Sequence, residues 1–121
     1  MWDRFDELAA LLDDATPRQF EDVLTAHVGL LAEDALFEKV TAASHPALER
    51  TSSARDALIV QLAGLMDRTR AEGLLRPDVD APTVLSLACG LAHAMRNAGG
   101  GTDGPLARTL LRVAFDGLRP V

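Results

Sequence analysis

Apolar residues recur every three or four positions along most of this chain, which is the spacing of amphipathic α-helices. In residues 2–14, for example, apolar side chains fall on one helical face and acidic side chains on the other. No segment alternates with the period of two that is typical of strands, and no hairpin dipeptide joins two such segments. The pattern predicts an all-α domain, a bundle of five or six helices, spanning residues 2–14, 17–32, 34–43, 46–72, 80–98 and 105–118.

Helix-start and helix-end signals flank several of these segments. Thr16 to Gln19 has the form of a capping box with proline at the first helical position. Asp80 is a natural N-cap, because its carboxylate can accept hydrogen bonds from free amides of the first turn, and Pro82 lies inside that turn. Gly73 follows the segment 46–72 and is a plausible C′ residue. These local signals fix the helix boundaries more firmly than hydrophobic spacing alone.

The segment 80–98 differs from the others because it is apolar on nearly every side. A surface helix has one apolar stripe, so this helix is expected to meet its own core on one face and a second protein on the other. The segment 105–118 has the same character. A strip of small and polar residues along the first of these helices would let another helix approach closely: Ser86, Gly90, His93 and Asn97.

Two copies of this helix pair would close a four-helix interface with two-fold symmetry. The residues expected in this interface are Leu87, Gly90, Leu91, His93, Ala94, Leu110, Leu111, Ala114, Phe115 and Leu118. The alternative is a monomer whose outer helices cover the same face.

Composition and charge narrow the function classes. A chain of 121 residues forms one domain, and its net charge of −6 is uneven, with 12 acidic and 5 basic residues in 1–60 against 6 and 7 in 61–121. No basic patch appears, so this chain alone should not bind nucleic acid. No apolar run approaches the roughly 20 residues of a membrane span and no signal peptide is present, which favours the cytoplasm. The single cysteine, Cys89, is expected to be a buried structural thiol.

The titratable residues do not form a recognisable catalytic or metal-binding motif. The three histidines lie on different helices without a partner at metal-ligand spacing, and the acidic pairs are adjacent, so they point to different faces. We therefore expect no metal, no cofactor and no enzyme activity. His27 lies among apolar neighbours, and two interpretations stay open: a core histidine bonded to a carbonyl, or a polar anchor in a ligand cavity.

Two segments carry a family resemblance. Residues 71–80 (AEGLLRPDVD), followed by an apolar helix, resemble the middle of C-terminal domains in TetR/AcrR-type transcriptional regulators. Residues 110–120 (LLRVAFDGLRP) resemble the last helix of the same domains, and the SbtR-like subgroup of actinobacteria is the most similar. Both segments are structural rather than chemical motifs.

This resemblance implies a homodimer built by the last two helices and a cavity among the preceding ones. A small apolar or amphipathic effector in that cavity would move the helix that links this domain to the DNA-binding domain. Residues 2–14 resemble the tail of that linking helix. Assigned by helical face alone, the expected lining is Phe20, His27, Leu31, Phe37, Leu62 and Met66. The family's N-terminal helix-turn-helix is absent here, so DNA contact is expected only through that missing domain. The first helix has no cap at its start, which favours a truncated chain over a natural protein that lacks the helix-turn-helix.

Two other classes of function remain open from sequence. One is a small helical module that binds another protein through residues 80–118. The other is a helical enzyme that uses His27 or His93.

Overall fold

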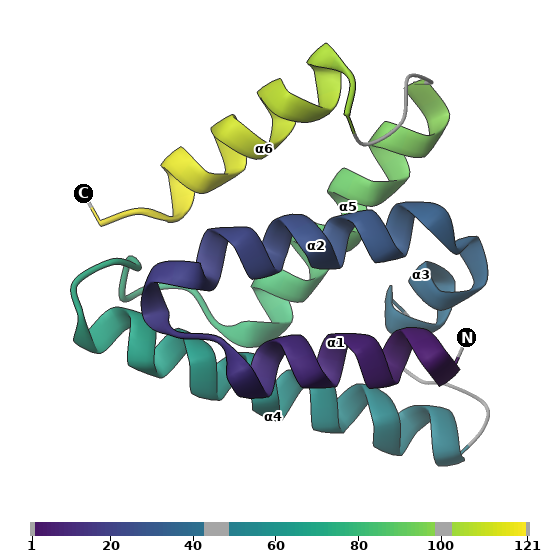
Figure 1. The fold of residues 1–121 in the computed structure, drawn as a ribbon, viewed down its shortest axis with the longest axis horizontal. Coiled ribbons are helices and arrows are strands. Elements are labelled where there is room, and N and C mark those ends of the chain that lie inside the picture. Colours follow the sequence, from purple (N-terminus) through teal and green to yellow (C-terminus); the bar gives the residue numbers. More distant parts are fainter. Residues whose placement is uncertain (1, 43–48, 99–102, 121) are drawn as a thin grey trace.

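The computed structural model describes residues 2–42, 49–98 and 103–120, and these are helical almost throughout (Figure 1). The helices are α1 (Trp2–Asp14), the short 3-10 helix η1 (Pro17–Gln19), α2 (Phe20–Glu33), α3 (Ala35–Ala42), α4 (Glu49–Ala71), α5 (Ala81–Ala98) and α6 (Pro105–Leu118). No strand occurs in these described ranges, so the all-α prediction is confirmed. The expected boundaries agree within a few residues, although positions 43 and 46–48 of the predicted helices lie outside the described residues.

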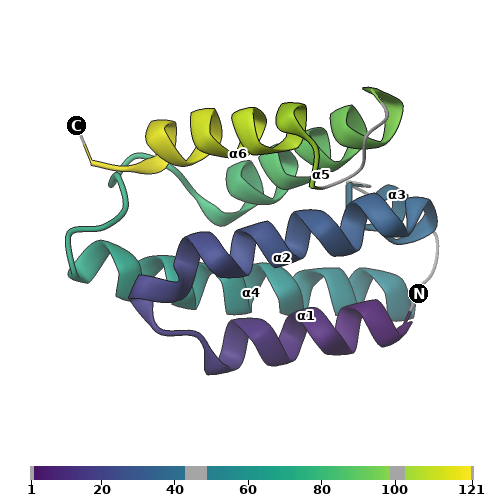
Figure 2. The ribbon, with the colours of Figure 1, turned by 45° about the horizontal axis from the view of Figure 1, so that its top comes forward.

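The bundle is built around α5, which contacts α2, α3, α4 and α6. Helix α1 packs chiefly against α4, and α6 has α5 as its main neighbour. Consequently α6 lies at the edge of the molecule, on the side away from α1 and α4 (Figures 1 and 2). This arrangement leaves one long side of α6 without a helical neighbour among the described residues.

The core is mostly aliphatic, with a few aromatic rings at the α1 side. Leu8, Leu65 and Ala92 come from α1, α4 and α5 and have no exposed surface. The rings of Phe5 and Phe37 meet edge to face with centroids 4.9 Å apart, which joins α1 to α3. Each of the buried leucine and phenylalanine side chains contributes roughly 1.5–3 kcal/mol through burial of its apolar surface.

The predicted helix signals have the expected local geometry. The amide of Thr16 donates to Gln19 Oε1 at 2.9 Å, and the amide of Thr83 donates to Asp80 Oδ1 at 2.9 Å. After α4, Gly73 adopts a φ of 73°. Its amide donates to the Arg70 carbonyl and that of Leu74 to the Thr69 carbonyl, at 2.9 and 3.1 Å, which is a Schellman motif. A side chain at this left-handed position would be strained, so glycine ends α4 here.

The two segments that carried the family resemblance meet in space. The amide of Arg76, in the turn before α5, donates to the carbonyl of Leu118 at the end of α6, at 2.9 Å. The Arg76 guanidinium donates to the Gly117 carbonyl at 2.9 Å and is held by Asp78 at 2.6 and 2.9 Å. This joint fixes the C-terminal end of α6 to the turn that starts α5.

Candidate functional site

The six residues expected to line an effector cavity all lie in the interior. Their exposed fractions are at most 4%. The five apolar ones belong to one continuous core, to which α2, α3 and α4 contribute. They are Phe20, Leu31, Phe37, Leu62 and Met66, with His27 on α2. Of the six, Phe20 alone lines one of the three pockets described below.

His27 is the ionisable member of this group. The imidazole is 2% exposed, and its Nε2 atom has no hydrogen-bond partner among the described residues. Burial lowers the pKa of His27 to about 4, so the ring is neutral at pH 7. A buried polar atom without a partner costs roughly 1–3 kcal/mol. A molecule that offered this nitrogen a hydrogen bond would recover part of that cost.

His93 has a different environment, at the last turns of α5. The side chain is 67% exposed, and its Nδ1 lies 3.8 Å from Glu38 Oε1 on α3. The other oxygen of Glu38 accepts a hydrogen bond from Arg96, whose guanidinium also donates to the Leu31 carbonyl at 3.1 Å. The cluster ties α5 to α2 and α3, and it could not be predicted from the sequence because its members are far apart along the chain.

The other titratable groups offer little reactive chemistry. Cys89 is buried as expected, and burial raises the pKa of its thiol to about 11, so the sulfur is protonated. Within the described ranges, no three His, Cys, Asp or Glu side chains are grouped as metal ligands would be. In the same part of the chain, no helix is long and apolar enough to cross a membrane.

The residues predicted for an interface divide into two groups. Five of them line a narrow crevice where α5 and α6 meet α2 within the chain: Leu87, Leu91, Ala114, Phe115 and Leu118. Leu118 is only 7% exposed, so it is largely part of the domain's own core. Gly90 and His93 are exposed, and Ala94, Leu110 and Leu111 are half-buried.

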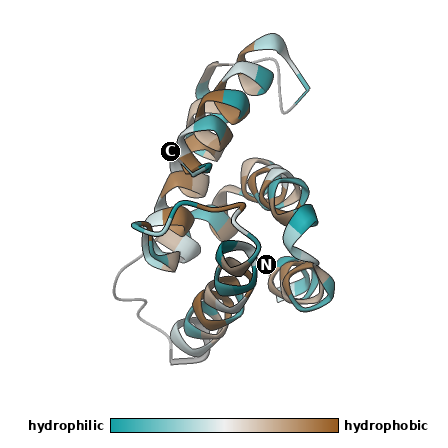
Figure 3. Ribbon diagram, turned by 90° about the vertical axis from the view of Figure 1, so that its left-hand side faces the viewer, coloured by the Kyte–Doolittle hydropathy of each residue, from teal (hydrophilic) through white to brown (hydrophobic). Residues whose placement is uncertain are grey.

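The outer side of α6 exposes more apolar side chains than the sequence predicted. Val113 is 66% exposed and Leu106 is 45% exposed, and neither was among the predicted interface residues. Their separation of seven residues places them on one helical face, a signal that the sequence did contain. Viewed from the side, the helix that leads to the C-terminus carries hydrophobic positions along its length (Figure 3). On α5, a Cβ built at Gly90 would meet no atom within 4 Å.

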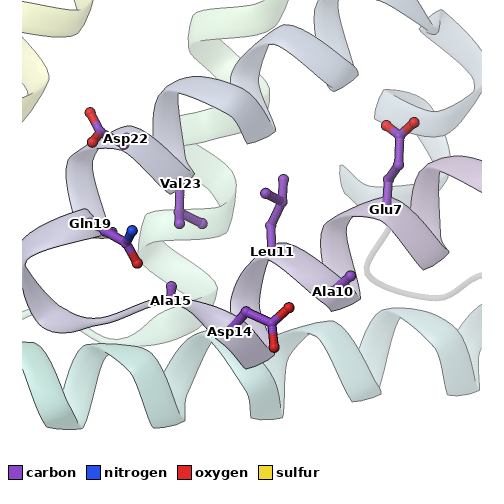
Figure 4. A pocket seen from close by; sticks show the side chains of 8 residues that line it. All are labelled: Glu7, Ala10, Leu11, Asp14, Ala15, Gln19, Asp22 and Val23. Carbon is purple, nitrogen blue, oxygen red and sulfur yellow. The ribbon is translucent and has the colours of Figure 1, made fainter.

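The surface of the domain also has two open grooves. One, of about 570 Å³, lies between α1 and α2 (Figure 4). The other, of about 750 Å³, lies at the end of the bundle near Phe20 and Gly73. There Arg119 donates to both oxygens of Glu21 at 3.1 Å, which holds the C-terminal segment against α2.

Comparison with known protein families gives a match that includes both of the segments that meet at Arg76. No curated protein and no solved structure matches the chain. The family model of the C-terminal domain of SbtR-like transcriptional regulators matches residues 18–120. This range includes α2 to α6 and all of η1 except its first residue, Pro17. The chain therefore belongs to the TetR-type family of SbtR-like C-terminal domains, and it is a regulatory domain of a transcriptional regulator.

Proposed function

We propose that this domain binds a small apolar or amphipathic effector and forms a homodimer, and that the effector controls DNA binding by a helix-turn-helix in the parent regulator. Family membership supports the regulatory role. The observation that carries the more specific proposal is the apolar outer side of α6, which no helix of the described ranges covers.

Burial and helix contacts support the dimer. Helix α6 packs mainly on α5, yet it presents Leu106 and Val113 to solvent and leaves Leu110 half-buried. A contiguous apolar face of this kind marks an interaction surface. Exposed Gly90 leaves space for a close helix approach on α5. Two α5–α6 pairs related by a two-fold axis would bury both faces in a four-helix interface.

The buried Nε2 atom of His27, which has no hydrogen-bond partner among the described residues, supports the effector site. Its six expected lining residues are packed in the present conformation, so an effector would enter by separating helices. Helix α2 carries His27, and its neighbour α1 is held to it and to α4 by polar contacts at the surface, including Gln61 to Asp13 at 3.1 Å and Arg4 to Glu33 at 3.6 Å. Such exposed contacts are worth less than about 1 kcal/mol each. Helix α1 also buries three apolar side chains in the core, so an effector that moved α1 would have to cover that apolar surface itself.

The dimer is tested by solution mass. Light scattering across a dilution series should give twice the chain mass for the wild-type domain at low micromolar concentration. Val113→Arg should give the single-chain mass, because it places a charge in the apolar interface. Val60→Arg is the matched control, since Val60 is 71% exposed on α4, and it should stay dimeric. A wild-type domain that is monomeric throughout the series would contradict the proposal.

The effector site is tested with indazole, a neutral apolar probe that carries one hydrogen-bond donor and one acceptor. Millimolar indazole should raise the melting temperature of the wild-type domain, because ligand binding to the folded state stabilises it. The rise should be at least halved in His27→Leu, which fills the same buried position with an apolar side chain and removes the ring nitrogens. Equal rises in the two proteins would show that His27 does not anchor the probe.

A further inference from the structure

The groove between α1 and α2 has the size of a small-molecule site. Its volume of about 570 Å³ lies within the range of roughly 300–1,000 Å³ that is usual for ligand pockets. Helix α1 supplies one wall, α2 supplies the other, and the turn that joins them closes one end (Figure 4). The lining residues are Glu7, Ala10, Leu11, Asp14, Ala15, Gln19, Asp22 and Val23.

The floor of this groove is apolar. Ala15 and Val23 are buried beneath it, while Ala10 and Leu11 are exposed on the α1 side. Leu11 is 37% exposed and extends between the two helices (Figure 4). An alkyl or aryl group placed here would cover Leu11 and Val23, and burial of that apolar area would favour binding.

The rim is acidic and has no basic residue in its lining. Glu7 lies toward one end, Asp22 toward the other, and Asp14 along one side (Figure 4). The carboxylates of Asp14 and Asp22 make no hydrogen bond or ion pair within the described residues, and only Glu7 shares a cation, Arg4, at 3.6 Å. The groove also lies in the half of the chain that carries the acidic excess. Uncompensated carboxylates around an apolar floor attract cations.

We propose that the α1–α2 groove binds an organic cation with a short apolar body. The cationic head lies among the rim carboxylates, and the apolar body lies on Leu11 and Val23. The site shares no lining residue with the expected cavity at His27, so it goes beyond the effector site proposed above and does not depend on it. Because α1 forms one wall, an occupied groove fixes the position of α1 relative to α2.

Three matched probes separate charge from hydrophobicity. Isothermal titration below micellar concentration should show saturable binding of one octyltrimethylammonium per chain. Octyl sulfate has the same tail with the opposite charge and should not bind measurably. Tetramethylammonium has the head without the tail and should bind at least tenfold more weakly. Added salt should weaken the binding of octyltrimethylammonium, since the carboxylates are exposed. No binding of it, or equal binding of octyl sulfate, would overturn the proposal.

Variants locate the site. Asp14→Asn with Asp22→Asn should weaken octyltrimethylammonium binding roughly five- to tenfold, as expected for two partly exposed ion pairs. Asp3→Asn with Asp6→Asn is the matched control, because it removes the same charge from exposed positions of α1 outside the lining, and it should change the affinity less than about twofold. Ala10→Trp should abolish binding by filling the groove. Equal affinities in the two double variants would place the cation elsewhere and refute the assignment.

Discussion

At the scale of single residues, His27 combines a polar side chain with full burial. Its position on the inner face of α2 followed from helical spacing, and the structure confirms that the ring is buried. The hydrogen-bonding state of Nε2 did not follow, because it depends on which groups from α3, α4 and α5 surround it. The burial of the ring has a measurable consequence for stability.

We predict that His27 makes the domain less stable in mild acid. Its pKa is about 4 when folded and about 6.5 when unfolded, so the unfolded state binds more protons between these values. Well above pH 6.5 the ring is neutral in both states, so His27 imposes no pH dependence on the free energy of unfolding. As the pH falls from 6.5 toward 4, protonation of the unfolded state progressively lowers that free energy. Between pH 7 and pH 5 the free energy of unfolding should fall by about 2 kcal/mol.

Urea unfolding at the two pH values measures this difference, and His27→Leu should remove that 2 kcal/mol. His93→Gln also deletes an imidazole, but from an exposed position, and should retain it. If His27→Leu lost as much stability as the wild type, the pH dependence would have to come from other groups.

At the scale of elements, Arg96 joins three helices. From α5 it donates to Glu38 on α3 and to the Leu31 carbonyl near the end of α2, where helix carbonyls lack intrahelical partners. The Glu38 side chain is 12% exposed, so its charge is poorly hydrated. Such an ion pair matters mainly because losing one partner leaves a buried charge behind.

Arg96→Met should accordingly lower the free energy of unfolding by about 2 kcal/mol in urea titrations, since Glu38 loses its cationic donor and the Leu31 carbonyl loses one of its two donors. Adding Glu38→Gln should restore part of the loss. Arg4→Met breaks contacts at 3.6 Å with Glu7 and Glu33, whose side chains are more than half exposed, and should cost less than about 0.5 kcal/mol. Equal losses in Arg4→Met and Arg96→Met would mean that the Glu38–Arg96 pair is no more than a surface contact.

At the scale of the whole molecule, the helices divide the chain into two parts with different surfaces. Helices α1 and α2 contribute eight of the 18 acidic residues and form the α1–α2 groove, whereas α5 and α6 contribute the apolar outer face. The joint at Arg76 holds α6 at a fixed angle to the turn before α5, so the outer face is presented as one rigid surface. The solution mass of Val113→Arg tests this scale directly, because an exposed side chain on α6 can change assembly without changing the protomer's core.

The sequence alone determined the helices, their caps and the family. Hydrophobic spacing, the N-cap at Asp80 and the C′ glycine at Gly73 act within a few residues, so they can be recognised without knowledge of neighbours. The two family segments are also local patterns, so they could be recognised in the sequence. Their contact through Arg76 joins distant parts of the chain and could not be.

Only the tertiary structure decided which faces of α5 and α6 turn inward. Both helices are apolar on most sides, so spacing could not separate Phe115 and Leu118, which face α2, from Val113, which faces solvent. The packing of α2 against α5 makes that choice. The same holds for the α1–α2 groove, because its floor and its carboxylates come from segments whose distance apart is set by how the whole bundle packs, rather than by any local pattern.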